Sequence, residues 1–592
     1  MTFQFLGPDP LERQIAETLQ RLAAGHVPAQ IETAQIDMKE EPGRRRGRAV
    51  VPGGENNEEA AAYFAEEMAC MSNTAGGGAI IVGIADDGER IGTDLDAQWL
   101  RHRIYELTER KLTVDVRDGV LDGCRILVMA THEAIEPIRY RGRLRWRVDD
   151  NCVEVDASTW HTGRLHRSGF DWSAQPSGHT LDDVRPVAVE LAARYLRLRG
   201  GSSDLDLAEA STPDLIRRLN LVDGEGTLTN AGSLLFVATP CVGIDYMRRD
   251  APGGDSRTRI RGEGPLLEQI HEAERAGEAA NPTFHVAHGF SHGQMHVIPP
   301  RALREAIVNG VVHRDWMSPQ PTTVEHVGES LAVTSPGGFV GGISSSNIIS
   351  HPAVPRYRCL AEAAAALGIA ERQGIGVARM TRDMLALGRP RPQIGEIVGP
   401  YVRVTLLGGE PDPEMIRLVS DIRPTQLAES VDALLLIDEV CTRGWIDAAS
   451  AAPVLQRPSA EAADAIERLE AAKLGDEQDA YCRRPLDLVP GVIVQVAGTG
   501  LAEPPAYRLS DESRHRIGHR CAWLQSAEGQ NELLLDWARC RDRVSSTEAA
   551  DLIDVSIVTA GKRLAALAAD GSLVPSRSNG TGRGFHYRPS PD

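Results

Sequence analysis

A segment at 304–315 most constrains what this chain can fold into. It carries Glu305 and Asn309 four positions apart, in a run whose apolar residues recur at helical spacing. A helix would place the carboxylate and the carboxamide on one face, with His313 one turn further along. A glutamate that can hold a water, beside an asparagine that can hold Mg²⁺, suits the hydrolysis of a phosphoanhydride. The alternative interpretation is an ordinary helix face turned to solvent.

Two glycine clusters follow this segment. Gly337 and Gly338 close a predicted strand at 330–334, and Gly374 and Gly376 open a second predicted helix. Backbone amides of such glycines can approach phosphate closely, and a helix N-terminus adds a favourable dipole. Together with the Glu–Asn pair, the two clusters favour a nucleotide site over a solvated helix face.

The order and spacing of these motifs, over roughly 180–408, resemble the GHKL ATPase superfamily. More narrowly, they resemble the RecG-like ATP-binding domain of Schlafen-type transcriptional regulators. The resemblance implies a GHKL-type α/β sandwich with ATP and Mg²⁺ as cofactors. Glu305 would be the water-activating base, and Asn309 would be the Mg²⁺ ligand. The other nucleotide-binding residues would be His313, Gly337, Gly338, Gly374 and Gly376.

One position departs from this pattern. The superfamily usually recognises adenine with an Asp at the start of the first glycine cluster, where this chain has Ser335 and Pro336. Adenine selectivity and ATP turnover therefore do not follow from the resemblance alone, and a weak ATPase is the expected activity. GHKL domains often dimerise when they bind nucleotide, so the resemblance also implies a homo-oligomer, in the simplest case a dimer.

The length of 592 residues predicts several domains. We expect an α+β multidomain protein divided at 1–165, 166–410, 411–510 and 511–592. No apolar run approaches the ~20 residues of a membrane helix, and the N-terminus lacks the pattern of a signal peptide. We therefore expect a cytoplasmic protein that is not bound to a membrane.

The cysteines and the net charge limit the kinds of metal site and nucleic-acid surface that the protein can have. Nine scattered cysteines without a C-x-x-C pair predict reduced thiols and argue against structural zinc. The net charge of −19 argues against a uniformly basic nucleic-acid coat but allows a local basic surface.

The first domain carries a second resemblance, over roughly 32–160. A turn-rich loop at 72–78 leads into an apolar strand at 79–84 and then into Asp-Asp-Gly at 86–88. With the charged element at 32–39, this pattern resembles the AlbA_2, or Schlafen-core, domain. Members of that family include nucleic-acid-binding regulators, and some Schlafen proteins cleave RNA with three carboxylates.

Carried over by position, these carboxylates would be Glu32, Asp37 and Asp86, with Asp37 and Asp86 as metal ligands. Lys39 shares a strand face with Asp37 and could stabilise phosphoryl charge. The alternative is that Asp37 and Lys39 face solvent on a strand and that 86–88 is simply a turn. We rank cleavage below simple nucleic-acid binding.

A basic run at 139–147 gives the best candidate nucleic-acid surface. On a single strand its arginines would share one face, and a row of guanidinium groups can follow a phosphate backbone. The alternative is a charged outer face that pairs with an acidic helix. Nucleic acid is favoured because adjacent like charges repel unless an anion is present. These arginines are Arg139, Arg141, Arg143, Arg145 and Arg147.

Two winged-helix modules are predicted in the C-terminal third. In the second, Ser545 and Glu548 form a capping box, a candidate recognition helix covers 556–569, and a wing follows at 573–587. The first repeats the helix pattern within 430–509, and its acidic helices suggest a structural or dimerisation role. Winged helices also dock proteins, so that alternative stays open. The expected nucleic-acid contacts of the second module are Lys562, Arg563, Arg577 and Arg583.

These features together predict an ATP-binding, nucleic-acid-binding regulator whose nucleotide state alters the arrangement of its nucleic-acid-binding ends. One alternative is a metal-dependent nuclease effector, for example in phage defence, with the ATPase domain as its sensor. A scaffold that does not hydrolyse ATP is the other.

Overall fold

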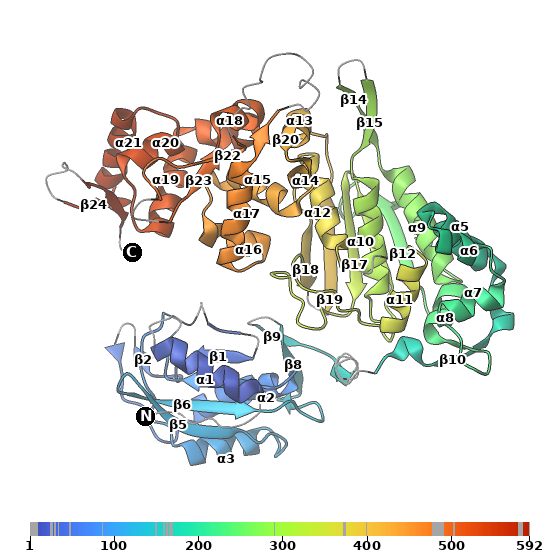
Figure 1. Cartoon of the computed structure of the whole chain (residues 1–592). Coiled ribbons are helices and arrows are strands. Elements are labelled where there is room, and N and C mark those ends of the chain that lie inside the picture. The colour runs from blue at the N-terminus through green and yellow to red at the C-terminus, as the bar shows by residue number, and fades with distance from the viewer. Residues whose placement is uncertain are drawn as a thin grey trace.

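The computed structural model describes residues 10–590, apart from 24–27, 29–30, 34, 47–48, 86, 149–150, 158–159, 162–163, 165–169, 289–290, 371–373, 398–399, 476–490, 501–503 and 578–583. The chain forms a mixed α/β protein of several domains (Figure 1). The predicted site residues Asp86 and Arg583 lie outside the described residues. Within the described part, no helix is long and apolar enough to cross a membrane.

The N-terminal domain is built on a four-stranded sheet in the order β1-β4-β6-β5. The first two strands are parallel, and the remaining pairs are antiparallel. Every residue of β4 is buried, because alternate side chains pack on helices at opposite faces of the sheet. The elements are α1 (Pro10–Ala23), β1 (Ile36–Lys39), α2 (Glu58–Asn73), β4 (Gly78–Val82), α3 (Ala97–Leu107), β5 (Asp115–Leu121) and β6 (Cys124–Thr131).

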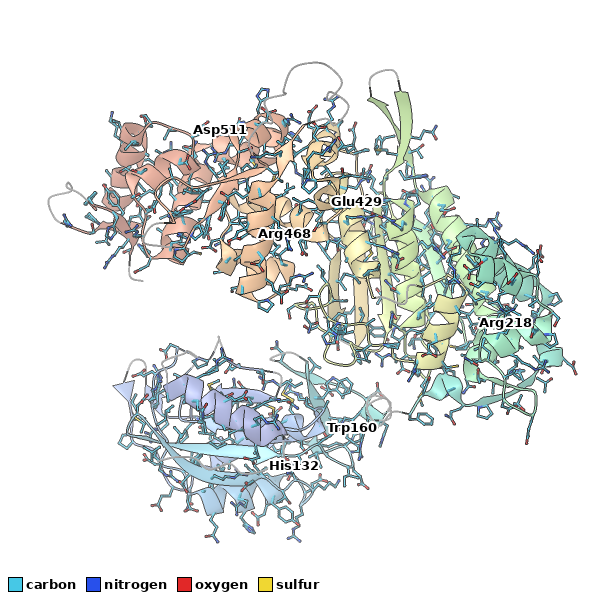
Figure 2. All side chains as sticks on the ribbon, in the orientation of Figure 1. His132, Trp160, Arg218, Glu429, Arg468 and Asp511 are labelled. Carbon is cyan, nitrogen blue, oxygen red and sulfur yellow. A yellow bond between two sulfur atoms is a disulfide. The ribbon has the colours of Figure 1, made fainter. Side chains whose placement is uncertain are left out.

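Smaller sheets border this domain. They are formed by β2 (Arg45–Arg46) with β3 (Ala49–Val50), and by β7 (Arg139–Tyr140), β8 (Arg143–Val148) and β9 (Asn151–Glu154). Trp160, labelled in Figure 2, is fully buried near the end of the domain and donates a 2.9 Å hydrogen bond to the carbonyl of Asn73. The turn-rich loop after α2 is therefore anchored to the end of its domain.

The middle domain is built on a six-stranded sheet in the order β13-β12-β16-β17-β19-β18. Strands β12 and β16 are parallel, and the other described neighbours are antiparallel. Helices pack on one face, as the alternating burial along β16 shows. The strands are β12 (Ile244–Arg249), β13 (Ser256–Arg261), β16 (Thr322–Val327), β17 (Ser330–Pro336), β18 (Gln393–Ile397) and β19 (Tyr401–Leu407).

Helix α10 (Pro300–Val312) lies directly on this sheet because Gly310 has no side chain. A Cβ at Gly310 would come within 2.6 Å of Val333 on β17. The surrounding helices are α5 (Pro186–Arg199), α6 (Ser202–Ala208), α7 (Thr212–Arg218), α8 (Asn230–Phe236), α9 (Leu266–Ala280), α11 (Arg358–Ala366) and α12 (Gly376–Ala386). Short pairs complete the domain: β10 (Pro176–Thr180) with β11 (Thr227–Thr229), and β14 (Thr283–His288) with β15 (Ser291–His296), a hairpin that extends away from the main sheet (Figure 1).

The C-terminal third is mainly helical, with short two-stranded sheets. The predicted capping box is confirmed, because the Ser545 hydroxyl accepts from the Glu548 amide at 3.2 Å and the Glu548 carboxylate accepts from the Ser545 amide at 2.7 Å. Trp445 packs edge-on against Trp537, with ring centroids 4.8 Å apart, so the two C-terminal modules share a core.

The elements of the first part are α13 (Pro413–Asp421), β20 (Ile422–Arg423), α14 (Thr425–Ala428), α15 (Val431–Arg443), α16 (Ala448–Leu455), α17 (Ser459–Ala471), β21 (Lys473–Leu474), β22 (Ile493–Gln495) and β23 (Tyr507–Leu509). Those of the second are α18 (Asp511–Ile517), α19 (Ala527–Arg541), α20 (Ser546–Leu552), α21 (Ile557–Ala569), β24 (Leu573–Pro575) and β25 (Tyr587–Pro589).

One expectation about the cysteines is wrong. Cys70 on α2 and Cys152 on β9 form a disulfide, although the sequence predicted reduced thiols. They lie 82 positions apart, so no local spacing pattern marks the pair. The other described cysteines are free.

Candidate nucleotide site and nucleic-acid surfaces

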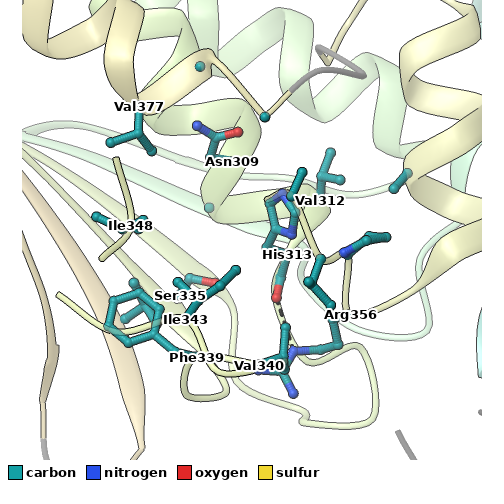
Figure 3. A pocket seen from close by; sticks show the side chains of 18 of the residues that line it. Asn309, Val312, His313, Ser335, Phe339, Val340, Ile343, Ile348, Arg356 and Val377 are labelled. Atoms are coloured by element: carbon teal, nitrogen blue, oxygen red, sulfur yellow. Dashed lines mark hydrogen bonds between the residues drawn. The ribbon is translucent and has the colours of Figure 1, made fainter. Parts of the chain in front are cut away.

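The fold brings the predicted nucleotide residues together around one cavity of about 700 Å³ in the middle domain. Its walls come from α10, from both glycine clusters and from the segment 337–357 that links β17 to α11. Figure 3 shows Asn309, His313, Ser335 and Arg356 around this space. The predicted residues that line it are Glu305, Asn309, His313, Gly337, Gly338, Gly374 and Gly376.

Glu305 and Asn309 both reach the cavity from α10, as their spacing predicts. Glu305 is only 8% exposed. Gly376, the first residue of α12, approaches both side chains closely. A Cβ at this position would lie 2.5 Å from Oε2 of Glu305 and 3.4 Å from Nδ2 of Asn309. The N-terminus of α12, with its free amides, therefore stands beside the carboxylate and the carboxamide.

This donor set fits Mg²⁺. The ion takes oxygen ligands, usually one or two from protein, and completes its shell with waters and substrate phosphates. Asn309 offers a side-chain oxygen to the cavity, the Glu305 carboxylate can hold a water beside it, and the adjacent helix N-terminus suits the phosphates.

His313 is the C-terminal cap residue of α10, and its ring is exposed in the cavity. The enclosing walls remove part of its hydration, and with the guanidinium group of Arg356 they lower the pKa of His313 below its usual range. The ring is therefore neutral at pH 7, and it can offer a hydrogen bond to a ligand without adding charge.

Arg356 is a cavity residue that sequence reasoning missed. Its Nε donates to the carbonyl of His313 at 3.1 Å, and its Nη2 donates to the carbonyl of Gly338. Arg356 therefore ties the end of α10 to the first glycine cluster. Burial lowers the pKa of its guanidinium group, but an arginine stays charged, so a cation stands in the cavity wall. Its partners lie 43 and 18 positions away, so no local motif could reveal it.

The two residues that follow His313, Arg314 and Asp315, make structural contacts within the domain. Arg314 is fully buried and donates to the carbonyls of Gly243 at 2.8 Å and Ser318 at 3.0 Å. Asp315 accepts a 2.9 Å hydrogen bond from the hydroxyl of Tyr357. These contacts hold the chain between α10 and β16, and neither side chain lines the cavity.

Ser335 stands where the superfamily usually has an Asp, and it is buried in the wall of the cavity (Figure 3). Its hydroxyl can donate and accept a hydrogen bond. A carboxylate is present close by, on β18. Oε2 of Glu396 accepts from the amide of Phe339 at 3.0 Å, and a Cβ at Gly338 would lie 2.5 Å from Oε1 of Glu396.

In the first domain, Asp37 is 2% exposed and is balanced by cations of the protein. Its Oδ2 accepts from Arg147 at 3.0 Å, and its Oδ1 accepts from Lys39 at 2.9 Å. Burial alone would raise the pKa of Asp37, but these two cations outweigh burial and hold it below its usual value. The pKa of nearby Glu32 is raised, mainly by burial.

The described residues contain no group of three or more His, Cys, Asp or Glu side chains arranged to hold a metal. Asp86 lies outside these residues, so metal binding by Asp37 and Asp86 stays a prediction.

The geometry predicted for the arginine run is wrong. A tight turn at Arg141 and Gly142, with φ of 51° and 81°, splits the run into the antiparallel strands β7 and β8. Arg145 pairs with Glu66 of α2 at 2.6 Å, and Arg147 is buried against Asp37. The exposed arginines that remain are Arg139, Arg141 and Arg143, which we call the hairpin arginines.

In the C-terminal module, Lys562 and Arg577 are exposed. Arg563 is half-buried and donates to the carbonyl of Ala527 at 3.1 Å. At the start of α21, Ile557 and Val558 are 57% and 69% exposed. Sequence reasoning missed this apolar pair at the start of the predicted recognition helix.

Two family models match parts of this chain, and one solved structure matches nearly all of it. Residues 32–156 match the family model "Schlafen, AlbA_2", and residues 320–406 match the model "Putative ATP-dependent DNA helicase recG C-terminal". No curated protein matches the chain. The crystal structure of the DIP2311 protein from Corynebacterium diphtheriae is 31% identical, with a TM-score of 0.60, over 98% of this chain and 99% of that one. The chain therefore belongs to the family of the DIP2311 protein, and it combines a Schlafen AlbA_2 domain with a RecG-like ATPase-type domain.

Proposed function

We propose that this protein is an ATP-binding, nucleic-acid-binding regulator whose nucleotide state alters how it holds nucleic acid. One observation carries the nucleotide part. Glu305, Asn309 and both glycine clusters, which are far apart in the sequence, line a single cavity. The RecG-like ATPase-type match covers 320–406 and so includes both glycine clusters but not α10. The position of α10 in the cavity is therefore independent support.

The roles of the residues follow from their chemistry. The Asn309 side-chain oxygen would hold Mg²⁺, which offsets phosphate charge when bound. The Glu305 carboxylate would orient a water and accept its proton. The glycine clusters bring backbone amides close to phosphate, and Arg356 adds a cation at the wall. Ser335 would hydrogen-bond the base in place of the usual Asp.

Two substitutions separate these roles. Glu305→Gln should keep Mg·ATP affinity within about threefold and lower turnover by about 10²-fold or more, because only the base is removed. Asn309→Ala should instead weaken Mg·ATP binding itself. Affinity is measured by calorimetry with the full chain, and turnover by phosphate release. A wild-type chain that binds no nucleotide would refute the proposal.

The coupling part rests on contacts of the segment 337–357. Ile348 of this segment lines the cavity, and the amide of the next residue, Ile349, donates to Oε1 of Gln456 at 2.7 Å. Gln456 is the C-terminal cap residue of α16 in the first C-terminal module. Its Nε2 donates to the carbonyl of Ser345 at 2.8 Å, and its carbonyl accepts from Oγ of Ser350 at 2.5 Å. A nucleotide that moves this segment would therefore strain or break these hydrogen bonds and so change the position of the C-terminal module.

Gln456→Ala tests this coupling. It removes both side-chain hydrogen bonds but leaves the cavity and the backbone hydrogen bond to Ser350 intact, so nucleotide affinity should change little while nucleic-acid affinity loses most of its dependence on ATP. Arg457→Ala is the matched control, because Arg457 pairs with Glu461 and Asp432 inside its own module. Retention of the full ATP effect in Gln456→Ala would exclude this route.

Two surfaces would bind nucleic acid. In the AlbA_2 domain the exposed hairpin arginines would contact phosphates. In the C-terminal module, α21 followed by the strands β24 and β25 supports a winged-helix interpretation. Nucleotide-dependent dimerisation remains part of the proposal through the GHKL resemblance. We rank the nuclease alternative below the regulator, because both oxygens of Asp37 accept hydrogen bonds from protein cations in the described part of the chain.

A further inference from the structure

A second cavity, of about 830 Å³, adjoins the nucleotide cavity. Helices α5, α6, α7, α9 and α10 and the end of α11 enclose it. Glu305 lines both cavities, together with Ala365 and Ala370. Asn309 and the two glycine clusters line only the first. The Glu305 side chain therefore stands in the wall between the two spaces.

The lining of this second cavity carries five arginines against four carboxylates. Two of them are paired, Arg199 with Asp204 and Arg304 with Glu274 at 3.0 Å. Among the described residues, Arg218 and Arg275 have no ion-pair partner, and both are exposed. The arginines of the lining are Arg194, Arg199, Arg218, Arg275 and Arg304.

Burial and the arginines both act on two titratable groups of this lining. The pKa of His271 is lowered, first by burial and then by Arg194 and Arg275, so the ring is neutral at pH 7. Burial raises the pKa of Glu274, although Arg304 opposes this shift. Glu278 and Asp204 are the other acidic groups that face the cavity from α9 and α6, besides Glu305 in the shared wall. A concave surface with unbalanced arginines attracts a small oxyanion.

We propose that the arginine-lined cavity binds the inorganic phosphate formed beside Glu305 and passes it to solvent. This rests on the proposed function, because phosphate arises there only from ATP hydrolysis. In that reaction the water oxygen bonds to the γ-phosphorus, and the bond from that phosphorus to the bridging oxygen breaks. ADP keeps the bridging oxygen, and the proton of the water passes to the Glu305 carboxylate and then to solvent.

The placement of the arginines suits a path. Glu305 lies at the inner end, and Arg304 precedes it on the same helix. Arg218, at the end of α7, lies at the outer surface of the domain, away from the C-terminal modules (Figure 2). Phosphate would move from a buried carboxylate, which repels it, toward exposed guanidinium groups, which attract it.

The experiment titrates inorganic phosphate by calorimetry into the full chain saturated with ADP and Mg²⁺. The double variant Arg218→Ala/Arg275→Ala should bind phosphate about tenfold more weakly, since it lacks two charge-assisted hydrogen-bond donors. Its ADP affinity should stay within twofold of wild type. The matched control is Arg197→Ala/Arg217→Ala, which removes two exposed arginines from α5 and α7 that do not line the cavity. The control should bind phosphate as wild type does.

The outcomes separate the two proposals. If ADP binds and the double variant binds phosphate as tightly as wild type, the phosphate path is overturned. It is also overturned if the double variant loses nucleic-acid affinity instead of phosphate affinity. If no ADP binds but phosphate binding still depends on Arg218 and Arg275, the nucleotide proposal fails and the anion site stands.

Discussion

Gly376→Ala tests the geometry of the nucleotide cavity at its closest approach. The backbone at Gly376 is helical, so alanine is compatible with its dihedral angles, and only the new methyl group matters. That group would lie 2.5 Å from Oε2 of Glu305, and ordinary contact begins near 3.4 Å. The carboxylate must therefore retreat by about 0.9 Å. A displacement of about 1 Å can cost about 10²-fold in rate, so we expect turnover to fall by about that factor.

Stability should report the same clash. Overpacking costs about 1–3 kcal/mol, and because the clashing atom is the end of a flexible side chain the cost should lie at the lower end, with a small fall in the thermal midpoint of Gly376→Ala. In a Glu305→Ala background the obstructing carboxylate is absent, and the same substitution should cost almost nothing. Gly395→Ala is the matched control, because a Cβ there would meet nothing within 4 Å. If Gly376→Ala keeps wild-type turnover, or costs as much stability without Glu305 as with it, then the two residues do not meet as described.

Two further predictions concern the first domain. Asp37→Asn removes the carboxylate that balances buried Arg147 and should cost about 3–5 kcal/mol in unfolding free energy. The folded-state pKa of Asp37 lies below its unfolded value, so the stabilisation is present above about pH 4 and is lost as pH falls through the folded pKa. Acid titration of the unfolding midpoint should show this loss in wild type and not in Asp37→Asn. Replacing the hairpin arginines with Ala should weaken binding to all nucleic-acid sequences alike and reduce the salt slope by up to about 0.9 for each phosphate that the variant no longer neutralises. Arg145→Ala, which breaks the pair with Glu66, should have a smaller effect, and an equal effect would contradict the hairpin geometry.

The sequence revealed the parts of the cavity that depend on local spacing. The four-residue interval between Glu305 and Asn309 sets a common helix face, and the capping box at Ser545 marks the start of α20. These features depend on residues within one turn of helix, where periodicity and capping chemistry are informative. The cavity wall formed by Arg356 was invisible, because it exists only after β17, α10 and the segment 337–357 have packed together.

The arginine run shows how one residue misleads a periodic interpretation. A single strand would have placed all its arginines on one face, but Gly142 accepts a positive φ and lets the chain reverse. A glycine inside a strand pattern was the available signal of a turn. The burial of Arg147 could not be predicted from the local pattern, because its partner Asp37 lies 110 positions away. A buried ion pair between distant segments leaves no mark on the local pattern.

The contacts at Gln456 also limit how strongly nucleotide can act on the C-terminal module. Three hydrogen bonds join this residue to the segment 337–357, and a hydrogen bond contributes about 0.5–1.5 kcal/mol net. Breaking them all therefore changes the balance by at most a few kcal/mol, which matches the typical range of allosteric coupling, about 1–3 kcal/mol or about 5–150-fold in affinity. Three such bonds together contribute about 1.5–4.5 kcal/mol, so ATP should shift nucleic-acid affinity by no more than about 10³-fold through this route. A larger shift that survives Gln456→Ala would require a second connection, such as nucleotide-dependent dimerisation, and its dependence on protein concentration would distinguish the two.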